Sequence, residues 1–307
     1  MILQRVSIVE LRIRASTGVY CIIGYPIAHS LSPVIHNHAF RLYGIDAVYV
    51  AFEVRPEMLE VAVNGIRALG IKGLTVTIPH KERIVAYLDY IDDVAKSIGA
   101  VNTVKNEDGR LLGYNTDVWG FLEPLKPYTS KLKGGSVLLI GAGGAARAIV
   151  YALKSLGVTR VYIANRTADR GLLMEKYALS LGLDAKYIGF DEIYMNELSR
   201  SVDLIVNATP LGMHGVGGRV PIGSDYINKD AIVYDIVYNP LETPLLMEAK
   251  KAGAITIPGI EMLVFQAILA FEIWTGIRPE PKPLRDVVIK ALKHQGQVNE
   301  NYIRKKD

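Results

Sequence analysis

The sequence VLLIGAGGAARAIVYALKSLGVTRVYIANRTADR occupies residues 137–170 and decides the fold of its region. An apolar run, a glycine turn, a helical pattern and a second apolar run follow one another as in a dinucleotide-binding βαβ unit. Gly141 allows the tight turn, Gly143 lets the backbone approach a pyrophosphate, and the small Ala146 lets helix and strand pack closely. The start of the helix offers free N–H groups and a partial positive charge to phosphates. We therefore predict a Rossmann-like dinucleotide-binding domain.

The end of the second apolar run indicates which dinucleotide is bound. An NAD site has Asp or Glu there to bind the ribose 2′-hydroxyl. Here Asn165, Arg166 and Thr167 are followed by Arg170, with Asp169 as the first carboxylate. One Arg guanidinium can bind two phosphate oxygens at once, so the pattern favours the 2′-phosphate of NADP. The alternative is a glycine turn that only packs, with solvated arginines.

Length and composition indicate a globular protein with two domains. The chain has 307 residues, of which 50% are hydrophobic and 21% charged, and its net charge is +4. We expect no nucleic-acid partner, because the basic residues are scattered apart from the last few. The single cysteine, Cys21, lies in an apolar run, so we predict that it is buried and inert.

We expect no membrane partner and a cytoplasmic location. The most apolar long stretch, residues 257–274, is interrupted by Glu261, Gln266 and Glu272. Residues 1–18 contain Glu10 and no continuous apolar segment, unlike a secretory signal. Their alternation of apolar residues predicts either an extra edge strand or an extension without function. Monomer and homodimer both remain open.

Strand-like and helix-like segments alternate along the whole chain, which is typical of parallel α/β folds. A hairpin is expected around the turn at residues 106–109. We predict strands at residues 20–24, 48–52, 73–78, 101–105, 109–114, 137–140, 161–164, 204–207, 231–235 and 254–257. We predict helices at residues 33–43, 56–69, 79–88, 116–125, 260–275 and 283–295, with others between the later strands.

Ser30 and Ser32 precede a predicted helix that begins at Pro33. Ser followed by Pro is the expected N-cap and first helical residue, which explains Ser32 without any ligand. Ser30 has no capping role in that scheme. The alternative is that the two hydroxyls, beside a helix N-terminus, bind a carboxylate.

The histidines do not predict a metal site. His36 and His38 are two positions apart, which places them on different sides of a helix. His29 lies outside that helix. We interpret the three as surface or structural residues.

Residues 75–81, TVTIPHK, run from the end of a strand into the predicted helix at 79–88, where α/β sheets usually bind their ligands. Lys81 could be a solvated lysine in the first turn of that helix, but a cation there opposes the helix dipole, so the position needs another explanation. Asn102 and Asp117 add an amide and a carboxylate at the ends of other elements, although Asp117 could simply satisfy a helix dipole.

The chain resembles the shikimate dehydrogenase family over roughly residues 20–276. Members reduce 3-dehydroshikimate to shikimate with NADPH, in aromatic amino-acid biosynthesis. They have two α/β domains with a cleft between them, and the last helices return to the first domain. The resemblance is carried, in chain order, by SLSP, TVTIPHK, GAVNT, YNTD, GAGGAARA, NRTADR, NATPLGM and GIEMLVFQA.

The resemblance implies a role for each matching residue. Lys81 and Asp117 would be the catalytic pair at the reacting hydroxyl, with Lys81 donating the proton in reduction. Residues 1–118 would bind the substrate and 119–259 the NADP, with 260–307 returning to the first domain. Ser30, Ser32 and Tyr238 would hold the substrate carboxylate, and Thr77, Asn102 and Gln266 its other hydroxyls. The implied cofactor residues are Gly141, Ala142, Gly143, Gly144, Ala145, Asn165, Arg166, Thr167, Arg170, Ile236 and Gly259, with Asp93 at a weaker position.

Few positions depart from the family pattern. Thr75 stands where many members have Asn, which changes a hydrogen bond, and residues 1–18 have no counterpart. A related branch that oxidises quinate with NAD often has an acidic residue after its Asn-Arg pair, and Thr167 argues against that branch. Two alternatives to the NADPH-dependent enzyme remain: a quinate/shikimate dehydrogenase using NAD or NADP, and a catalytically silent dinucleotide sensor. Retention of both Lys81 and Asp117 argues against the sensor.

Overall fold

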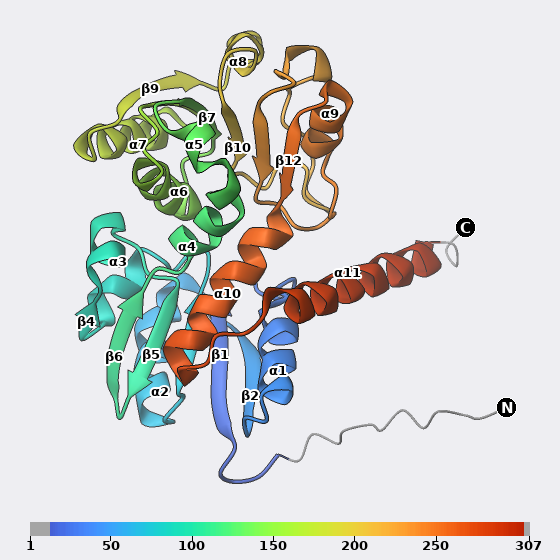
Figure 1. The fold of residues 1–307 in the computed structure, drawn as a ribbon. Coiled ribbons are helices and arrows are strands. Elements are labelled where there is room, and N and C mark those ends of the chain that lie inside the picture. Colours follow the sequence, from blue (N-terminus) through green and yellow to red (C-terminus); the bar gives the residue numbers. More distant parts are fainter. Residues whose placement is uncertain (1–12, 304–307) are drawn as a thin grey trace, which may run out of the picture.

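The computed structural model describes residues 13–303, with side chains as far as residue 294, and its strands form two six-stranded sheets (Figure 1). The edge strand proposed for residues 1–18 lies mostly outside the described residues. The first sheet contains β1 (Gly18–Gly24), β2 (Ala47–Glu53), β3 (Gly73–Val76), β4 (Tyr90–Ile91), β5 (Thr103–Glu107) and β6 (Arg110–Tyr114). The second contains β7 (Ser136–Ile140), β8 (Arg160–Ala164), β9 (Asp184–Gly189), β10 (Leu204–Asn207), β11 (Ile232–Asp235) and β12 (Ile255–Pro258).

Helices surround both sheets. Within residues 13–303, four are short 3-10 helices, at Pro56–Met58, Arg83–Tyr87, Glu123–Tyr128 and Ser224–Tyr226. In the first half of the chain the α-helices are α1 (Ser32–Leu42), α2 (Leu59–Ala68), α3 (Asp93–Ile98), α4 (Asp117–Leu122) and α5 (Thr129–Leu132). In the second half they are α6 (Gly144–Ser155), α7 (Ala168–Ser180), α8 (Glu192–Ser199), α9 (Pro244–Ala252), α10 (Gly259–Thr275) and α11 (Pro281–Ile303).

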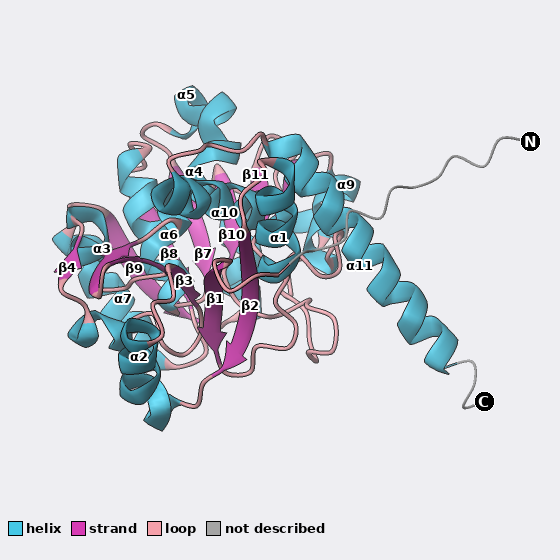
Figure 2. Ribbon diagram, turned by 90° about the horizontal axis from the view of Figure 1, so that it is seen from below, coloured by secondary structure: helices cyan, strands magenta, loops and turns pink. Residues whose placement is uncertain are grey.

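The first sheet is mixed, with the order β2-β1-β3-β5-β6-β4. Strands β1, β2 and β3 are parallel, while β5 pairs antiparallel with both β3 and β6, so the predicted hairpin is present. Both faces of β1 are buried: Tyr20 and Ile22 pack in the cluster that includes α1, and Cys21 and Ile23 pack beneath α2. Figure 2 shows α1 and α2 on opposite sides of these strands. Burial explains why this strand is apolar at successive positions.

The second sheet is parallel throughout, with the order β12-β11-β10-β7-β8-β9. Counted from β7, this is the strand order 3-2-1-4-5-6 of a Rossmann fold. The order reverses between β7 and β10, and ligands of such sheets bind at the carboxyl ends of the strands there. The predicted fold class, two α/β units of which one is Rossmann-like, is therefore confirmed.

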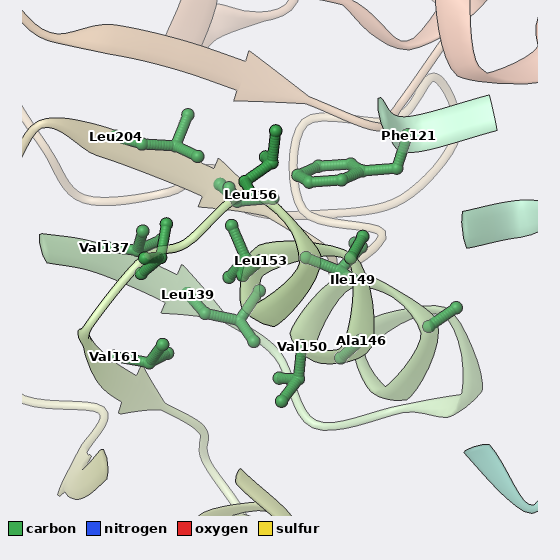
Figure 3. Packing of buried hydrophobic residues seen from close by; sticks show 14 of the residues in the cluster. Phe121, Val137, Leu139, Ala146, Ile149, Val150, Leu153, Leu156, Val161 and Leu204 are labelled. Atoms are coloured by element: carbon green, nitrogen blue, oxygen red, sulfur yellow. The ribbon is translucent and has the colours of Figure 1, made fainter. Parts of the chain in front are cut away.

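The glycine-turn helix α6 packs directly on the second sheet (Figure 3). Ala146, Ile149 and Leu153 are fully buried and share one apolar cluster with Val137 and Leu139 of β7. The small Ala146, near the start of the helix, is buried in this shared cluster, in agreement with the close packing that the sequence predicts.

Helix α10 connects the second sheet back to the first. It follows β12, packs along α4 and reaches α1 and β5, where the Trp274 indole donates a hydrogen bond to the Val104 carbonyl at 3.0 Å. Helix α11 then packs against α1, and Arg285 forms a two-bond ion pair with Glu261 of α10. No helix in the described part of the chain is long and apolar enough to cross a membrane.

Most predicted elements lie within one or two residues of the observed ones. Strands β4 and β9 and the short helices α3, α5 and Ser224–Tyr226 were not predicted, and α7, α8 and α9 were expected between the later strands without bounds. The helix predicted at residues 79–88 is wrong, because a turn and the 3-10 helix Arg83–Tyr87 occupy that segment. Cys21 is buried as predicted, and burial raises the pKa of its thiol to about 12.

Candidate active site

Lys81 and Asp117 form a direct ion pair. Lys81 lies in the turn after β3, and Asp117 begins α4, 36 residues later in the chain. The Lys81 Nζ atom is 2.5 Å from Asp117 Oδ2, and the two side chains are 15% and 7% exposed. A pair so shielded from solvent interacts more strongly than a surface pair, and loss of one partner leaves the other charge uncompensated.

One side-chain and two backbone hydrogen bonds, rather than an α-helix, hold the segment that contains Lys81. The His80 N–H donates to the Thr77 carbonyl, and the buried His80 Nε2 lies 2.7 Å from the Val54 carbonyl just after β2. The Lys81 carbonyl accepts from the Val101 N–H at 2.8 Å, which ties this turn to the segment before β5. Because no α-helix begins at Pro79, the helix-dipole argument about Lys81 was wrong.

Asn102 fixes the other oxygen of the Asp117 carboxylate. The Asn102 Nδ2 atom donates to Asp117 Oδ1 at 2.8 Å and to Thr116 Oγ1 at 2.9 Å. Its Oδ1 accepts from the Thr116 N–H and the Thr103 hydroxyl. The Asp117 N–H donates to Asn115 Oδ1, so the residue is held from both sides. The structure therefore unites three of the predicted residues, Lys81, Asn102 and Asp117, in one buried network.

The serines at the start of α1 are arranged differently from the capping scheme. The Ser30 hydroxyl accepts from the Ser32 N–H at 3.3 Å, and Ser32 is the first residue of the helix. The N-cap position belongs to Leu31, whose side chain makes no cap bond, and the Ser30 hydroxyl accepts from the first helical N–H instead. The prediction that Ser32 caps the helix is therefore wrong, because the helix begins one residue earlier than expected. Ser32 is buried and Ser30 is half-buried.

Thr75, which stands where many family members have Asn, has a hydrogen-bond partner in the interior. Its Oγ1 accepts from the Tyr49 phenol at 2.7 Å, and both residues are buried. Thr77 lies two residues further on, and its methyl group packs tightly against Gly24. A Cβ atom placed on Gly24 would lie 2.4 Å from that methyl carbon. The Tyr49 hydroxyl thus supplies the hydrogen bond that Thr75 needs in the interior.

Gln266 and Tyr238 reach this region from the second half of the chain. Gln266 lies on α10 opposite Gly120 of α4, where a Cβ on the glycine would meet Gln266 Cβ at 2.8 Å. Its amide Nε2 donates to the Leu263 carbonyl at 2.8 Å. Tyr238 packs against the apolar cluster of the first sheet, and burial raises the pKa of its phenol.

The three histidines differ in burial, and His36 lies in an aromatic cluster. His36 is buried, its ring stacks on Tyr49 with centroids 4.5 Å apart, and it also faces Phe271 and Trp274. Burial lowers the pKa of His36 to about 3, so the ring is neutral at ordinary pH. His38 is half-buried and His29 is exposed.

The glycine turn has the geometry of an anion site. Gly141 has φ +112°, and a Cβ there would lie 2.8 Å from the Ala208 carbonyl, so only glycine fits without strain. At Gly143, the N-cap of the twelve-residue α6, a Cβ would meet no atom within 4 Å. Gly144 faces Lys81, whose Cβ and Cδ lie 3.9 Å from a Cβ placed on the glycine. The turn therefore presents open backbone next to the ion pair. Ala142 precedes and Ala145 follows the two open glycines in the chain.

Asn165, Arg166, Thr167 and Arg170 gather at the start of α7. The Asn165 amide donates to the Thr167 carbonyl at 2.8 Å, and its own carbonyl accepts from the Tyr187 phenol at 3.1 Å. Thr167 is the N-cap of α7 but makes no side-chain cap bond. Both arginines are exposed. The segment therefore offers two cations just after the carboxyl end of β8, as an NADP 2′-phosphate requires.

Ile236 and Gly259 meet through their backbones. A Cβ on Gly259 would lie 2.3 Å from the Ile236 carbonyl oxygen, so only a glycine allows the start of α10 and the turn after β11 to approach so closely. Asp93, the weaker predicted position, is the first residue of α3.

Three family models match this chain. The shikimate dehydrogenase substrate-binding domain matches residues 22–104, shikimate/quinate 5-dehydrogenase matches 125–212, and the shikimate 5′-dehydrogenase C-terminal domain matches 259–293. The shikimate dehydrogenase (NADP(+)) of Methanothermobacter thermautotrophicus is 47% identical over 91% of this chain and 99% of its own.

The chain belongs to the shikimate dehydrogenase family.

Solved members of the family have the same fold. A shikimate dehydrogenase in complex with NADP+ is 41% identical, with a TM-score of 0.84 over 92% of this chain and 98% of that one. The Thermus thermophilus enzyme, in complex with NADP(H) and shikimate, is 37% identical, with a TM-score of 0.79 over 89% of this chain and 99% of its own.

One part of this shikimate dehydrogenase fold was missed in the sequence. Asp235, at the end of β11, is fully buried and accepts hydrogen bonds from Asn207 and Thr243. The available signal was a polar residue at the carboxyl end of each of two apolar strands: Asn207, the first residue of NATPLGM, and Asp235, the first residue of the sequence DIVY at 235–238.

Proposed function

We propose that this protein reduces 3-dehydroshikimate to shikimate with NADPH, and catalyses the reverse reaction, as an oxidoreductase of aromatic amino-acid biosynthesis. The observation that carries the proposal is the buried pair of Lys81 and Asp117 next to Gly144 of the glycine turn. An acid–base group and a dinucleotide site are thereby adjacent, as hydride chemistry at a hydroxyl-bearing carbon requires.

The residues present fit NADP. Open backbone at Gly143 leaves room for the pyrophosphate, and the N-terminus of α6 supplies N–H donors. We assign the diphosphate to residues 141–145 and the 2′-phosphate to Asn165, Arg166, Thr167 and Arg170. Ile236 and Gly259 would border the nicotinamide. When bound, NADPH supplies the hydride that the protein itself cannot provide.

Lys81 supplies the proton. In reduction, its ammonium donates a proton to the carbonyl oxygen of the substrate as negative charge develops there, and the neutral amine takes the proton back in oxidation. Asp117 holds the ammonium at this position, and Asn102 holds Asp117. The pair is shielded from solvent, which strengthens its attraction for a developing oxyanion.

The substrate carboxylate and hydroxyls have separate contacts in this proposal. Ser30 and Ser32, at the start of α1, and the Tyr238 phenol bind the carboxylate. Thr77, Asn102 and Gln266 bind the ring hydroxyls. We propose that residues 1–118 form the first domain, that 119–259 form the second, and that 260–307 return to the first, with a cleft between the two domains. The cytoplasmic location also remains a prediction, and monomer and homodimer both remain open.

Steady-state kinetics with shikimate or quinate, each with NADP+ or NAD+, test the proposal. We expect NADP+ reduction with shikimate at the highest kcat/KM of the four combinations. A higher kcat/KM with quinate and NAD+ would assign the protein to the quinate branch. No reduction with either acid, together with measurable NADPH binding, would favour the silent sensor.

A further inference from the structure

Asp235 joins three separate segments at the carboxyl edge of the second sheet. Its Oδ1 accepts from Asn207 Nδ2 at 2.9 Å and from the Val237 N–H at 3.0 Å, and its Oδ2 accepts from the Thr243 hydroxyl at 2.6 Å. Asn207 ends the neighbouring strand β10, and Thr243 is the N-cap of α9. One carboxylate therefore fixes the turn between β11 and α9 at both ends.

The turn that Asp235 fixes contains Ile236 and Tyr238. The Ile236 N–H donates to the Asn207 carbonyl at 3.1 Å, and the Ile236 carbonyl lies against Gly259. Tyr238 extends from the same turn and packs against the apolar cluster of the first sheet. A shift of this turn would therefore move one group assigned to the nicotinamide and one assigned to the substrate together.

The carboxylate is a costly way to stabilise a turn. Asp235 is fully buried, and among the described residues it forms no ion pair within 4.0 Å. A buried charge without a cation lowers stability unless hydrogen bonds offset it, and burial raises the pKa of this carboxyl to about 6. Its three donors all come from groups that define the shape of the turn, so geometry is what the carboxylate supplies.

We propose that Asp235 is a positioning residue that orients Ile236 and Tyr238 toward the reacting groups. The inference rests on the proposed function, because it uses the roles assigned to those two residues. It adds a residue outside the binding contacts to the determinants of substrate affinity and turnover. The phosphate end of the cofactor is held elsewhere, at residues 141–145 and 165–170, and should be unaffected.

The full-length Asp235→Ala and Asp235→Asn variants test this role by kinetics with shikimate and NADP+, together with titration of NADPH. For Asp235→Ala we expect KM for shikimate to rise and kcat to fall by about tenfold each, as lost hydrogen bonds to a charged group predict. The dissociation constant of NADPH should change less than about twofold. Asp235→Asn keeps Oδ1 as an acceptor and should restore both parameters to within about threefold of wild type.

Asp203→Ala is the matched control. Asp203 accepts a backbone hydrogen bond from Ser136 at 2.8 Å in the same sheet, but at the opposite edge of the strands. It should lower the melting temperature and leave KM and kcat unchanged. If Asp235→Ala does not fold, Thr243→Val replaces it in the comparison; this variant removes the bond to Oδ2 together with the N-cap bond from the Leu246 N–H.

Two outcomes would overturn the inference: Asp235→Ala kinetics equal to those of Asp203→Ala, or no recovery in Asp235→Asn. Both require a wild-type protein that reduces NADP+ with shikimate. An inactive wild type would instead contradict the proposed function itself, so the two failures are distinguishable.

Discussion

The substrate side of the site is made of side chains, whereas the cofactor side is made mostly of backbone. On the substrate side, Lys81, Asn102 and Asp117 come from separate segments and are joined by hydrogen bonds. On the cofactor side, residues 141–145 contribute a glycine turn and a helix N-terminus within one short stretch. Side chains can donate and accept protons, and backbone N–H groups can bind phosphates without changing protonation. The two regions therefore divide the work between proton transfer and binding.

The largest effect should come from the substrate side. Lys81→Ala removes the proton donor and should lower kcat by about a thousandfold, within the range for general acid–base catalysis. The dissociation constant of NADPH should change less than about twofold, since the phosphates are bound elsewhere. Stopped-flow kinetics and NADPH titration measure both, with Lys72→Ala, an exposed lysine beside β3, as the control. Near-wild-type turnover would remove Lys81 from the mechanism.

A side chain also acts on the cofactor side, at Arg166. Arg166→Ala should weaken NADPH binding by about thirtyfold, because a charge-assisted bond to phosphate is lost. NADH lacks the 2′-phosphate and should bind almost as before. The matched control is Arg160→Ala in the same sheet, whose guanidinium pairs with Asp184 instead. Equal losses for the two dinucleotides would contradict the 2′-phosphate assignment.

Alanine variants of Gly143 and Gly141 test two properties of the glycine turn: its access for the pyrophosphate and its need for a positive φ angle. Gly143 has φ −95° and open space, so Gly143→Ala should leave the melting temperature unchanged and weaken NADPH binding about tenfold by blocking the pyrophosphate. Gly141→Ala should lower the free energy of unfolding by about 2 kcal/mol, because its φ of +112° and the nearby Ala208 carbonyl reject a side chain. Calorimetry and titration of both variants check this, and a destabilised Gly143→Ala would show that the turn is not open.

The last effect concerns stability rather than catalysis, and it arises in the packing beneath the substrate side. His36 has a pKa of about 3 in the folded protein against 6.5 for an ordinary histidine, so only the unfolded chain takes up a proton as pH falls between those values. His36 therefore costs stability as pH falls below about 6.5, by about 1.4 kcal/mol for each pH unit, until the folded protein is protonated too.

Urea unfolding from pH 7 to pH 4 measures this linkage. His36→Phe should lose less stability than wild type over the range, while the exposed His29→Asn should follow wild type. Parallel curves for His36→Phe and wild type would mean that His36 takes up its proton with the same pKa in the native and the unfolded protein.

The two regions also differ in how far their structure could be predicted from the sequence. The strand, glycine turn and helix at residues 136–155 were predicted because their hydrogen bonds and packing are local. The contact between Lys81 and Asp117 depends on the mixed order of the first sheet, so only the family resemblance implied it. The helix at 79–88 failed because the His80 side chain binds the distant Val54 carbonyl and holds a turn. The bonds of Asp235 were missed for the same reason, since the β10–β11 pairing creates them.

The central claim is that Lys81 and Asp117 act as one proton-transfer unit beside the dinucleotide site. A double-mutant cycle with Lys81→Ala, Asp117→Asn and the double variant, measured as the single-turnover rate of NADP+ reduction by shikimate, tests it most directly. Residues that act as a unit lose their effect together, so the double variant should be within about threefold of Lys81→Ala. A rate in the double variant equal to the product of the two separate losses would contradict the claim.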